Sequence, residues 1–139
     1  MTDDQHAMLT TYVNDLRKAL GLRDWTVTVK HRPSTEDASA QVHCIYGQRL
    51  AHIRVAEDWW DDSPDDQRSH IVHELLHCHL DPTDTLVCSL EGTLGGGAFA
   101  IAHSAHETAV EFAVDGITRA VAPLLPLPAW AHNEERIAP

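Results

Sequence analysis

The chain has 139 residues, a length that suits one domain with its own hydrophobic core, and 43% of the residues are hydrophobic. The formal net charge is −11 with histidine neutral, which argues against the basic surface that nucleic-acid-binding modules use to neutralise phosphates. No segment approaches the roughly 18 consecutive apolar residues of a membrane span, and the acidic start lacks the features of a signal peptide. We therefore expect a cytoplasmic protein with neither nucleic acid nor membrane as partner.

Histidine is the residue type that stands out in this composition. The chain has eleven histidines, and His70, His73, His77 and His79 fall within ten residues. The three cysteines are an odd number at irregular spacing without a C-x-x-C pair, so they predict no disulfide framework. Reduced thiols agree with the expected cytoplasmic location.

The first 56 residues predict one helix and three strands. Apolar residues recur at helical spacing over residues 4–20. Residues 25–30 alternate and are rich in β-formers, and residues 40–46 and 50–56 predict two more strands. Gly47 lies in a turn between the last two, as in a hairpin, so we expect a largely antiparallel sheet.

Two longer helices are predicted in the rest of the chain. Ser63 and Pro64 suit the start of a helix, which should end near Leu80 because Pro82 opposes its extension. A glycine-rich loop then leads to a helix over residues 98–121. The remaining residues contain four prolines and are expected to wrap the surface.

These elements predict an α+β fold, with helices packed on one face of a small three-stranded sheet. We expect a single domain over residues 1–139. Its core should span about residues 5–121, and residues 122–139 should form a C-terminal tail.

The motif His73-Glu74-Leu75-Leu76-His77 lies within the first of the two long helices. Histidines four residues apart share one helix face, where both imidazoles can bind one zinc ion. Glu74 projects beside such an ion and can act as general base on a water that zinc activates. On a helical projection His70 joins these residues in one polar stripe, and the rest of the helix is apolar and should be buried. A solvated polar stripe without metal is the alternative.

A catalytic zinc site needs a third protein ligand, for which the last predicted helix supplies candidates. Glu107 lies near the border of an apolar arc on this helix, and Glu111 and Asp115 lie further out. Because a ligand must point inward, Glu107 is favoured over Glu111. His106 projects into the arc, either as a rival ligand or as a core histidine bonded to a carbonyl. His103, one turn before Glu107, is a candidate to stabilise an oxyanion. The arc consists of Ala105, Ala109, Phe112, Ala113, Gly116, Ile117 and Ala120.

A helix, a short sheet, an H-E-x-x-H helix and a glutamate-bearing helix together resemble the minimal zincin fold. In gluzincin-like families the third ligand is a glutamate in an E-x-x-x-D motif, whose acidic partner supports a zinc-binding histidine. Residues Glu107 and Glu111 resemble this motif with Glu in place of Asp, and Glu111 with Asp115 also fits its letters. Over roughly residues 20–121 the chain resembles small metallopeptidases of actinobacterial phages and prophages, and more distantly SprT-like and ImmA/IrrE-like zincins.

We therefore expect a zinc-dependent peptidase that uses Glu74 as general base on a peptide or protein substrate. An extended peptide could pair with a strand edge such as residues 50–56. The main alternative is a zinc-binding domain that binds a partner without proteolysis, and a metal-free accessory protein is a third reading. Glu74 favours the peptidase, because a structural zinc site has no need of a base. The sequence carries no signal of oligomeric state.

Overall fold

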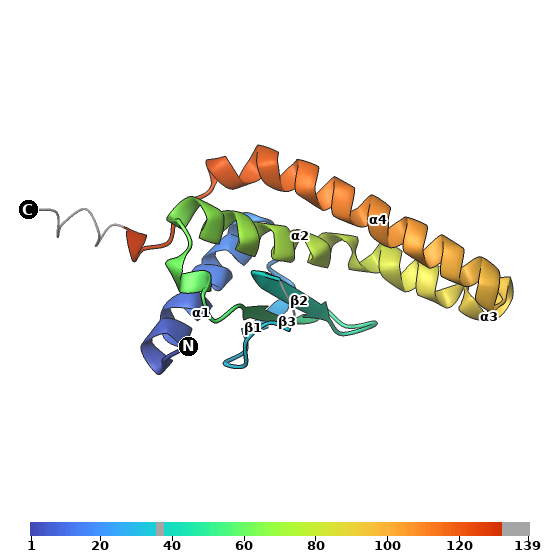
Figure 1. The fold of residues 1–139 in the computed structure, drawn as a ribbon, viewed down its shortest axis with the longest axis horizontal. Coiled ribbons are helices and arrows are strands. Elements are labelled where there is room, and N and C mark those ends of the chain that lie inside the picture. The colour runs from blue at the N-terminus through green and yellow to red at the C-terminus, as the bar shows by residue number, and fades with distance from the viewer. Residues whose placement is uncertain (36–37, 132–139) are drawn as a thin grey trace, which may run out of the picture.

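A computed structural model describes residues 1–35 and 38–131. The fold is α+β, with long helices on one side of a small sheet (Figure 1). Helix α2, Pro64–Ser89, lies between the sheet and helix α4, Gly96–Val121, which runs antiparallel to it. The far ends of α2 and α4 extend beyond the sheet as a helical hairpin, closed by the short helix α3, Glu91–Leu94.

The predicted first helix is confirmed as α1, Asp3–Ala19. A capping box between Thr2 and Gln5 starts it, and its apolar face buries Leu9, Val13 and Leu16 completely. After α1 the chain turns sharply, and the Arg17 side chain holds the turn by donating hydrogen bonds to three backbone carbonyls. The acceptors are those of Leu22, Arg23 and Trp25, at 2.8, 3.1 and 2.8 Å.

The three predicted strands are present as β1, Thr26–Val29, β2, Ala40–Cys44, and β3, Leu50–Val55. Their order is β1-β3-β2, in which β3 pairs parallel with β1 and antiparallel with β2. The expectation of a largely antiparallel sheet is therefore wrong. After β1 the chain continues to β2, which lies two positions away in the sheet. The β2–β3 hairpin then places β3 between β1 and β2. The predicted open edge at residues 50–56 is also wrong, because β3 is central and β2 forms the edge.

Helix α2 begins as predicted, with the Ser63 hydroxyl accepting from the Asp66 N–H and Pro64 in the first turn. It does not end near Leu80, however, but continues through Pro82 to Ser89. Proline in a helix interior costs about 3 kcal/mol, so tertiary packing has to offset this cost. The segment beyond Pro82 packs against α4, where Asp84 contacts His106 at 2.6 Å.

Helix α4 does not pack through the apolar arc that its sequence displays. The side chains buried against the rest of the protein are Val110, Val114 and Thr118, which lie one turn apart. Phe112 is 80% exposed, and the other members of the arc are exposed too. The inward face of α4 is therefore a narrow stripe flanked by acidic residues. In the described part of the chain, no helix is both long enough and apolar enough to cross a membrane.

The residues after α4 return to the body of the protein, as expected for a tail that wraps the surface. After the short helix η2, Ala122–Leu124, the Trp130 indole N–H donates to Gln67 Oε1 at 2.8 Å. Gln67 is fully buried, and its amide also donates to the carbonyls of Trp59 and Trp60 at 3.1 and 3.3 Å. This network fixes the tail to the start of α2. The end of the predicted tail, 132–139, lies outside the described residues.

Candidate metal centre

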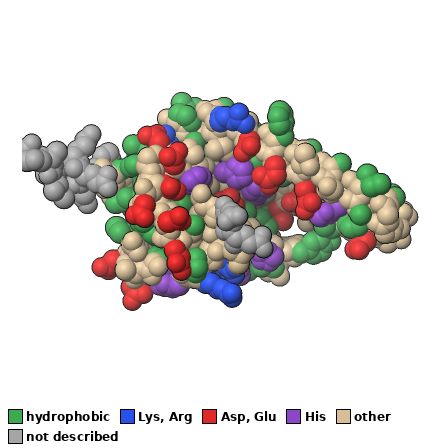
Figure 2. Space-filling view, viewed as in Figure 1, with side chains coloured by type: hydrophobic (Ala, Val, Ile, Leu, Met, Phe, Trp, Pro, Cys, Tyr) green, Lys and Arg blue, Asp and Glu red, His purple; other side chains and the backbone are tan. Residues whose placement is uncertain are grey.

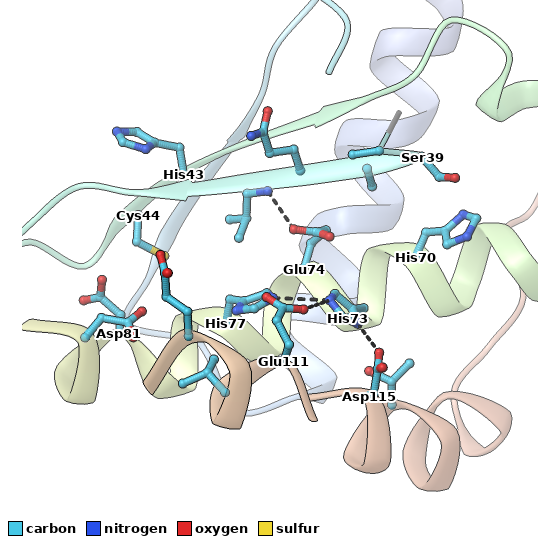
Figure 3. Close-up of a pocket in the computed structure, with 18 of the residues that line it drawn as sticks. Ser39, His43, Cys44, His70, His73, Glu74, His77, Asp81, Glu111 and Asp115 are labelled. Carbon is cyan, nitrogen blue, oxygen red and sulfur yellow. Dashed lines mark hydrogen bonds and ion pairs between the residues drawn. The ribbon is translucent and has the colours of Figure 1, made fainter. Parts of the chain in front are cut away.

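Two helices bring three side chains that could hold a metal ion to one point. The Nε2 atoms of His73 and His77 on α2 lie 3.3 Å apart. Glu111 on α4 approaches both histidines, with one carboxylate oxygen 3.4 Å from His73 Nε2 and the other 3.3 Å from His77 Nε2. Figure 3 shows the three side chains pointing toward one another from facing helices.

The spacing of these donor atoms suits a small tetrahedral ion. Zinc binds imidazole nitrogen and carboxylate oxygen at about 2.0–2.1 Å, which places neighbouring ligand atoms of a tetrahedron about 3.3–3.4 Å apart. The measured separations fall in this range. Two imidazoles with one carboxylate are also a donor set of catalytic zinc sites, whereas calcium and magnesium prefer all-oxygen sites. The residues present therefore fit zinc.

Asp115 orients the first histidine from one turn further along α4. One of its carboxylate oxygens lies 3.3 Å from His73 Nδ1 (Figure 3). A carboxylate at Nδ1 keeps the proton on that nitrogen. The lone pair of Nε2 is then free and points toward the cluster. Glu111 and Asp115 are four residues apart, so a single face of α4 brings one carboxylate to the Nε2 atoms of both histidines and another to His73 Nδ1.

Glu74 points from α2 toward the edge strand of the sheet. It is buried, and its Oε2 accepts a hydrogen bond of 2.7 Å from the Val42 N–H of β2 (Figure 3). Burial raises the pKa of the Glu74 carboxyl above its ordinary value, and the nearby Glu111 acts in the same direction. The charge of His73 and the Val42 N–H oppose this rise. One carboxylate oxygen is therefore held by the sheet, beside the cluster of ligands.

The environment of His77 favours its neutral, metal-binding form. Burial lowers the pKa of His77 below its ordinary value, although the carboxylate of Glu111 opposes this. Histidine must be neutral to bind a metal, so partial burial on α2 suits His77 to that role.

The structure places Glu111, not the favoured Glu107, against the two histidines. Glu107 lies one turn away, and its carboxylate is 3.5 Å from His103 Nδ1. His106, the rival ligand, contacts Asp84 instead of the cluster or a backbone carbonyl. The projection favoured Glu107 because it assumed that the apolar arc of α4 faces inward. That arc is exposed, and the stripe that faces α2 carries Glu111 nearest to the histidines.

The polar stripe of α2 is confirmed as the floor of a pocket of about 1200 Å³. His70, His73, Glu74 and His77 line it on α2, and His103, Glu107, Glu111 and Asp115 line it on α4. Figure 2 shows acidic and histidine side chains gathered on this face of the molecule. Among the described residues, those that line the pocket include no lysine or arginine. His70 lies at the rim of the pocket, 3.5 Å from a carboxylate oxygen of Asp62.

Two groups of the site were not assigned from the sequence. Asp115 was named among the acidic residues of the last helix and as a letter match to the E-x-x-x-D motif, but no role was given to it, and its spacing from Glu111 was the available signal. No pattern in the sequence pointed to the Val42 N–H, because this backbone donor meets Glu74 only through the packing of α2 on β2.

Comparison with protein-family models, curated proteins and solved structures gives no significant match for this chain. No relative therefore assigns it a family or an activity. Its function has to be inferred from the chemistry of the described residues.

Proposed function

We propose that this chain is a zinc-dependent peptidase with a zincin-like fold. In this proposal His73, His77 and Glu111 hold the metal, Asp115 orients His73, and Glu74 is the general base. Glu111 and Asp115 then correspond to the E-x-x-x-D pair of the gluzincin-like families that the chain resembles.

The observation that carries the proposal is the donor triangle with a buried carboxylate beside it. Three donor groups lie 3.3–3.4 Å apart, and the side chains of His73 and His77 are only 22% and 17% exposed. A purely structural zinc site is closed by four protein ligands, whereas a catalytic site keeps one position open. Among the described residues only three ligands meet, and they face an open pocket.

Zinc, when bound there, supplies a Lewis acid that polarises a carbonyl and lowers the pKa of water. The chain's own residues supply the rest. The Val42 N–H holds Oε2 of Glu74, which leaves the other oxygen to accept a proton. A buried carboxyl with a raised pKa is a stronger base than an exposed one, which suits it to general-base catalysis near neutral pH.

The edge strand β2 offers a place for an extended polypeptide. Residues 38–44 line the same pocket as the histidines and Glu74. The carbonyl of Ser39 and the N–H of Ile45 pair with the β3 side. The alternation of a strand then turns the backbone groups of Ala40 and Cys44 and the carbonyl of Val42 toward the open edge, where Glu74 already accepts from the Val42 N–H. A peptide added there would lie across the donor triangle.

Metal content of the purified protein tests the assignment of the ligands. Wild type supplied with zinc should retain about one ion per chain after removal of the excess. His77→Ala and Glu111→Gln should lose it, whereas Glu107→Gln, the matched control one turn away, should retain it. Retention in Glu111→Gln together with loss in Glu107→Gln would contradict the ligand set.

Cleavage of an unstructured protein such as casein, and of a mixed-sequence peptide library, tests the reaction. Wild type with zinc should cleave, and Glu74→Gln should keep the metal and the fold but lose at least a factor of about 100 in rate, as for a general base. Equal cleavage by wild type and Glu74→Gln would rule out the proposed base. A wild type that binds zinc stoichiometrically but cleaves no peptide in the library would favour the binding-domain alternative.

A further inference from the structure

Two cysteine side chains meet where the edge strand of the sheet packs on α2. The Sγ atoms of Cys44 on β2 and Cys78 on α2 lie 3.8 Å apart, and all three cysteines of the chain are free. The third, Cys88, follows Cys78 by ten residues on the same helix, which separates the two by about 15 Å along its axis. The fold therefore brings two of the thiols together and keeps the third apart from Cys78.

Local geometry aims both side chains at this contact. Val42 and Cys44 are half-buried and His43 between them is exposed, which is the alternation of a strand with one face on α2. Figure 3 shows Cys44 pointing from β2 toward α2. On α2, Cys78 lies one turn after Leu75, and both are buried in the core. The two thiols thus belong to the surfaces through which β2 and α2 pack.

Access from the solvent distinguishes the two thiols. Cys44 lines the pocket of the candidate metal centre, so a small oxidant that enters the pocket meets its sulfur. Cys78 is 1% exposed, so such an oxidant does not meet it directly. The oxidation of a thiol follows its exposure. Cys44 is therefore the thiol that reacts first, and Cys78 is the partner already in contact with it.

We propose that Cys44 and Cys78 form a reversible disulfide when the protein meets a peroxide. The Cys44 thiolate attacks one oxygen of hydrogen peroxide, the O–O bond breaks, and a sulfenic acid forms at Cys44 while hydroxide leaves. The Cys78 sulfur then attacks the Cys44 sulfur, the S–O bond breaks, and the second oxygen leaves as water with the proton of Cys78. Two thiols and one hydrogen peroxide thus give one disulfide and two waters, and the two electrons lost by the sulfurs reduce the peroxide.

The sulfur atoms have a short way to move. A disulfide bond is about 2.05 Å long, so each sulfur has to approach the other by about 0.9 Å from the present separation. A partial rotation about the Cα–Cβ bond of each cysteine supplies a movement of this size.

The disulfide would join the same two elements as the hydrogen bond of Glu74. The Val42 N–H, two residues before Cys44, donates to Glu74, which lies one turn before Cys78. A covalent link beside this bond closes a loop with a sequence separation of 34 residues and restricts the unfolded chain. For a loop of this length we expect oxidation to raise Tm by about 5–10 °C. The disulfide stands independently of the proposed peptidase activity.

Peptide mapping of the full chain by mass spectrometry tests the pairing. Metal-free protein is treated with a molar excess of hydrogen peroxide, its remaining thiols are blocked with N-ethylmaleimide in urea, and it is digested without reductant. Wild type should give a peptide pair joined through Cys44 and Cys78, with Cys88 outside the link, and dithiothreitol should restore both thiols. A link through Cys88, or an oxidised Cys44 without a bond to Cys78, would overturn the proposal.

Matched serine variants separate the roles of the cysteines. Cys88→Ser should form the link as wild type does, whereas Cys44→Ser should leave the buried Cys78 reduced under the same oxidant. Oxidation of Cys78 at an undiminished rate in Cys44→Ser would contradict the role of Cys44 as the thiol that reacts first. Thermal unfolding of Cys88→Ser, followed by circular dichroism, compares the oxidised and reduced forms. An oxidised form whose Tm is no higher than that of the reduced form would show that the disulfide does not fit the native packing of β2 on α2, and would also overturn the proposal.

Discussion

Replacing Trp130 by alanine would measure how strongly the tail stabilises the domain. The Trp130 ring packs edge-on against Tyr12 and Trp59, with ring centroids at 5.5 and 6.3 Å, and its N–H donates to the buried Gln67. The tail therefore connects α1, the segment before α2 and the first turn of α2. We expect this single side chain to contribute a large part of the tail's stabilising effect.

The magnitude follows from two terms. Truncating a fully buried tryptophan to alanine costs about 3–5 kcal/mol, and half of this is appropriate for the half-buried Trp130. Leaving Oε1 of the buried Gln67 without a donor adds about 1–3 kcal/mol. The total is about 3–5 kcal/mol, which corresponds to a fall in Tm of about 10–15 °C for a domain of this size. Trp130→Phe keeps most ring contacts but removes the N–H, and should cost only about 1–2 kcal/mol.

Urea denaturation followed by circular dichroism would give both free energies. Leu124→Ala is the control, because this tail residue is 82% exposed and its truncation should change stability by less than about 0.5 kcal/mol. A Trp130→Ala variant within about 1 kcal/mol of wild type would refute the packing of the tail described above.

Four further variants test other parts of the structure. Asp115→Asn should weaken zinc binding by about 10–100-fold, because it removes the carboxylate that orients His73 through Nδ1. Competition with a chromophoric chelator would measure this change in affinity. Pro82→Ala should raise the free energy of unfolding by about 1–3 kcal/mol, since Pro82 is exposed within α2 and alanine restores a helical N–H. Arg17→Ala should lower that free energy by about 1–3 kcal/mol by removing a charged donor from three carbonyls, and urea denaturation would detect it. Leu75→Ala should lower it by about 2–5 kcal/mol, because Leu75 is completely buried and leaves a cavity, and a smaller loss would contradict its place in the core.

The sequence by itself determined the features that depend on local periodicity and capping. Helix α2 starts where Ser63 and Pro64 predict. Its apolar residues Ile71, Val72, Leu75 and Leu76 are buried, while the stripe from His70 to His77 lines the pocket. The positions of the strands followed from alternation in the same way. These features depend on residues within a few turns of one another, so a single stretch of chain is enough to predict them.

Only the tertiary structure decided which acidic residue of α4 meets the histidines. The periodicity of a helix shows that an apolar arc exists, but it does not show whether the arc faces the core or the solvent. Here the narrow stripe of Val110 and Val114 faces inward, and this rotation brings Glu111 to His73 and His77. The order of the strands was likewise decided by the tertiary structure, because it depends on how the connection between β1 and β2 crosses the sheet. Both depend on contacts between segments far apart in the chain, which local patterns do not encode.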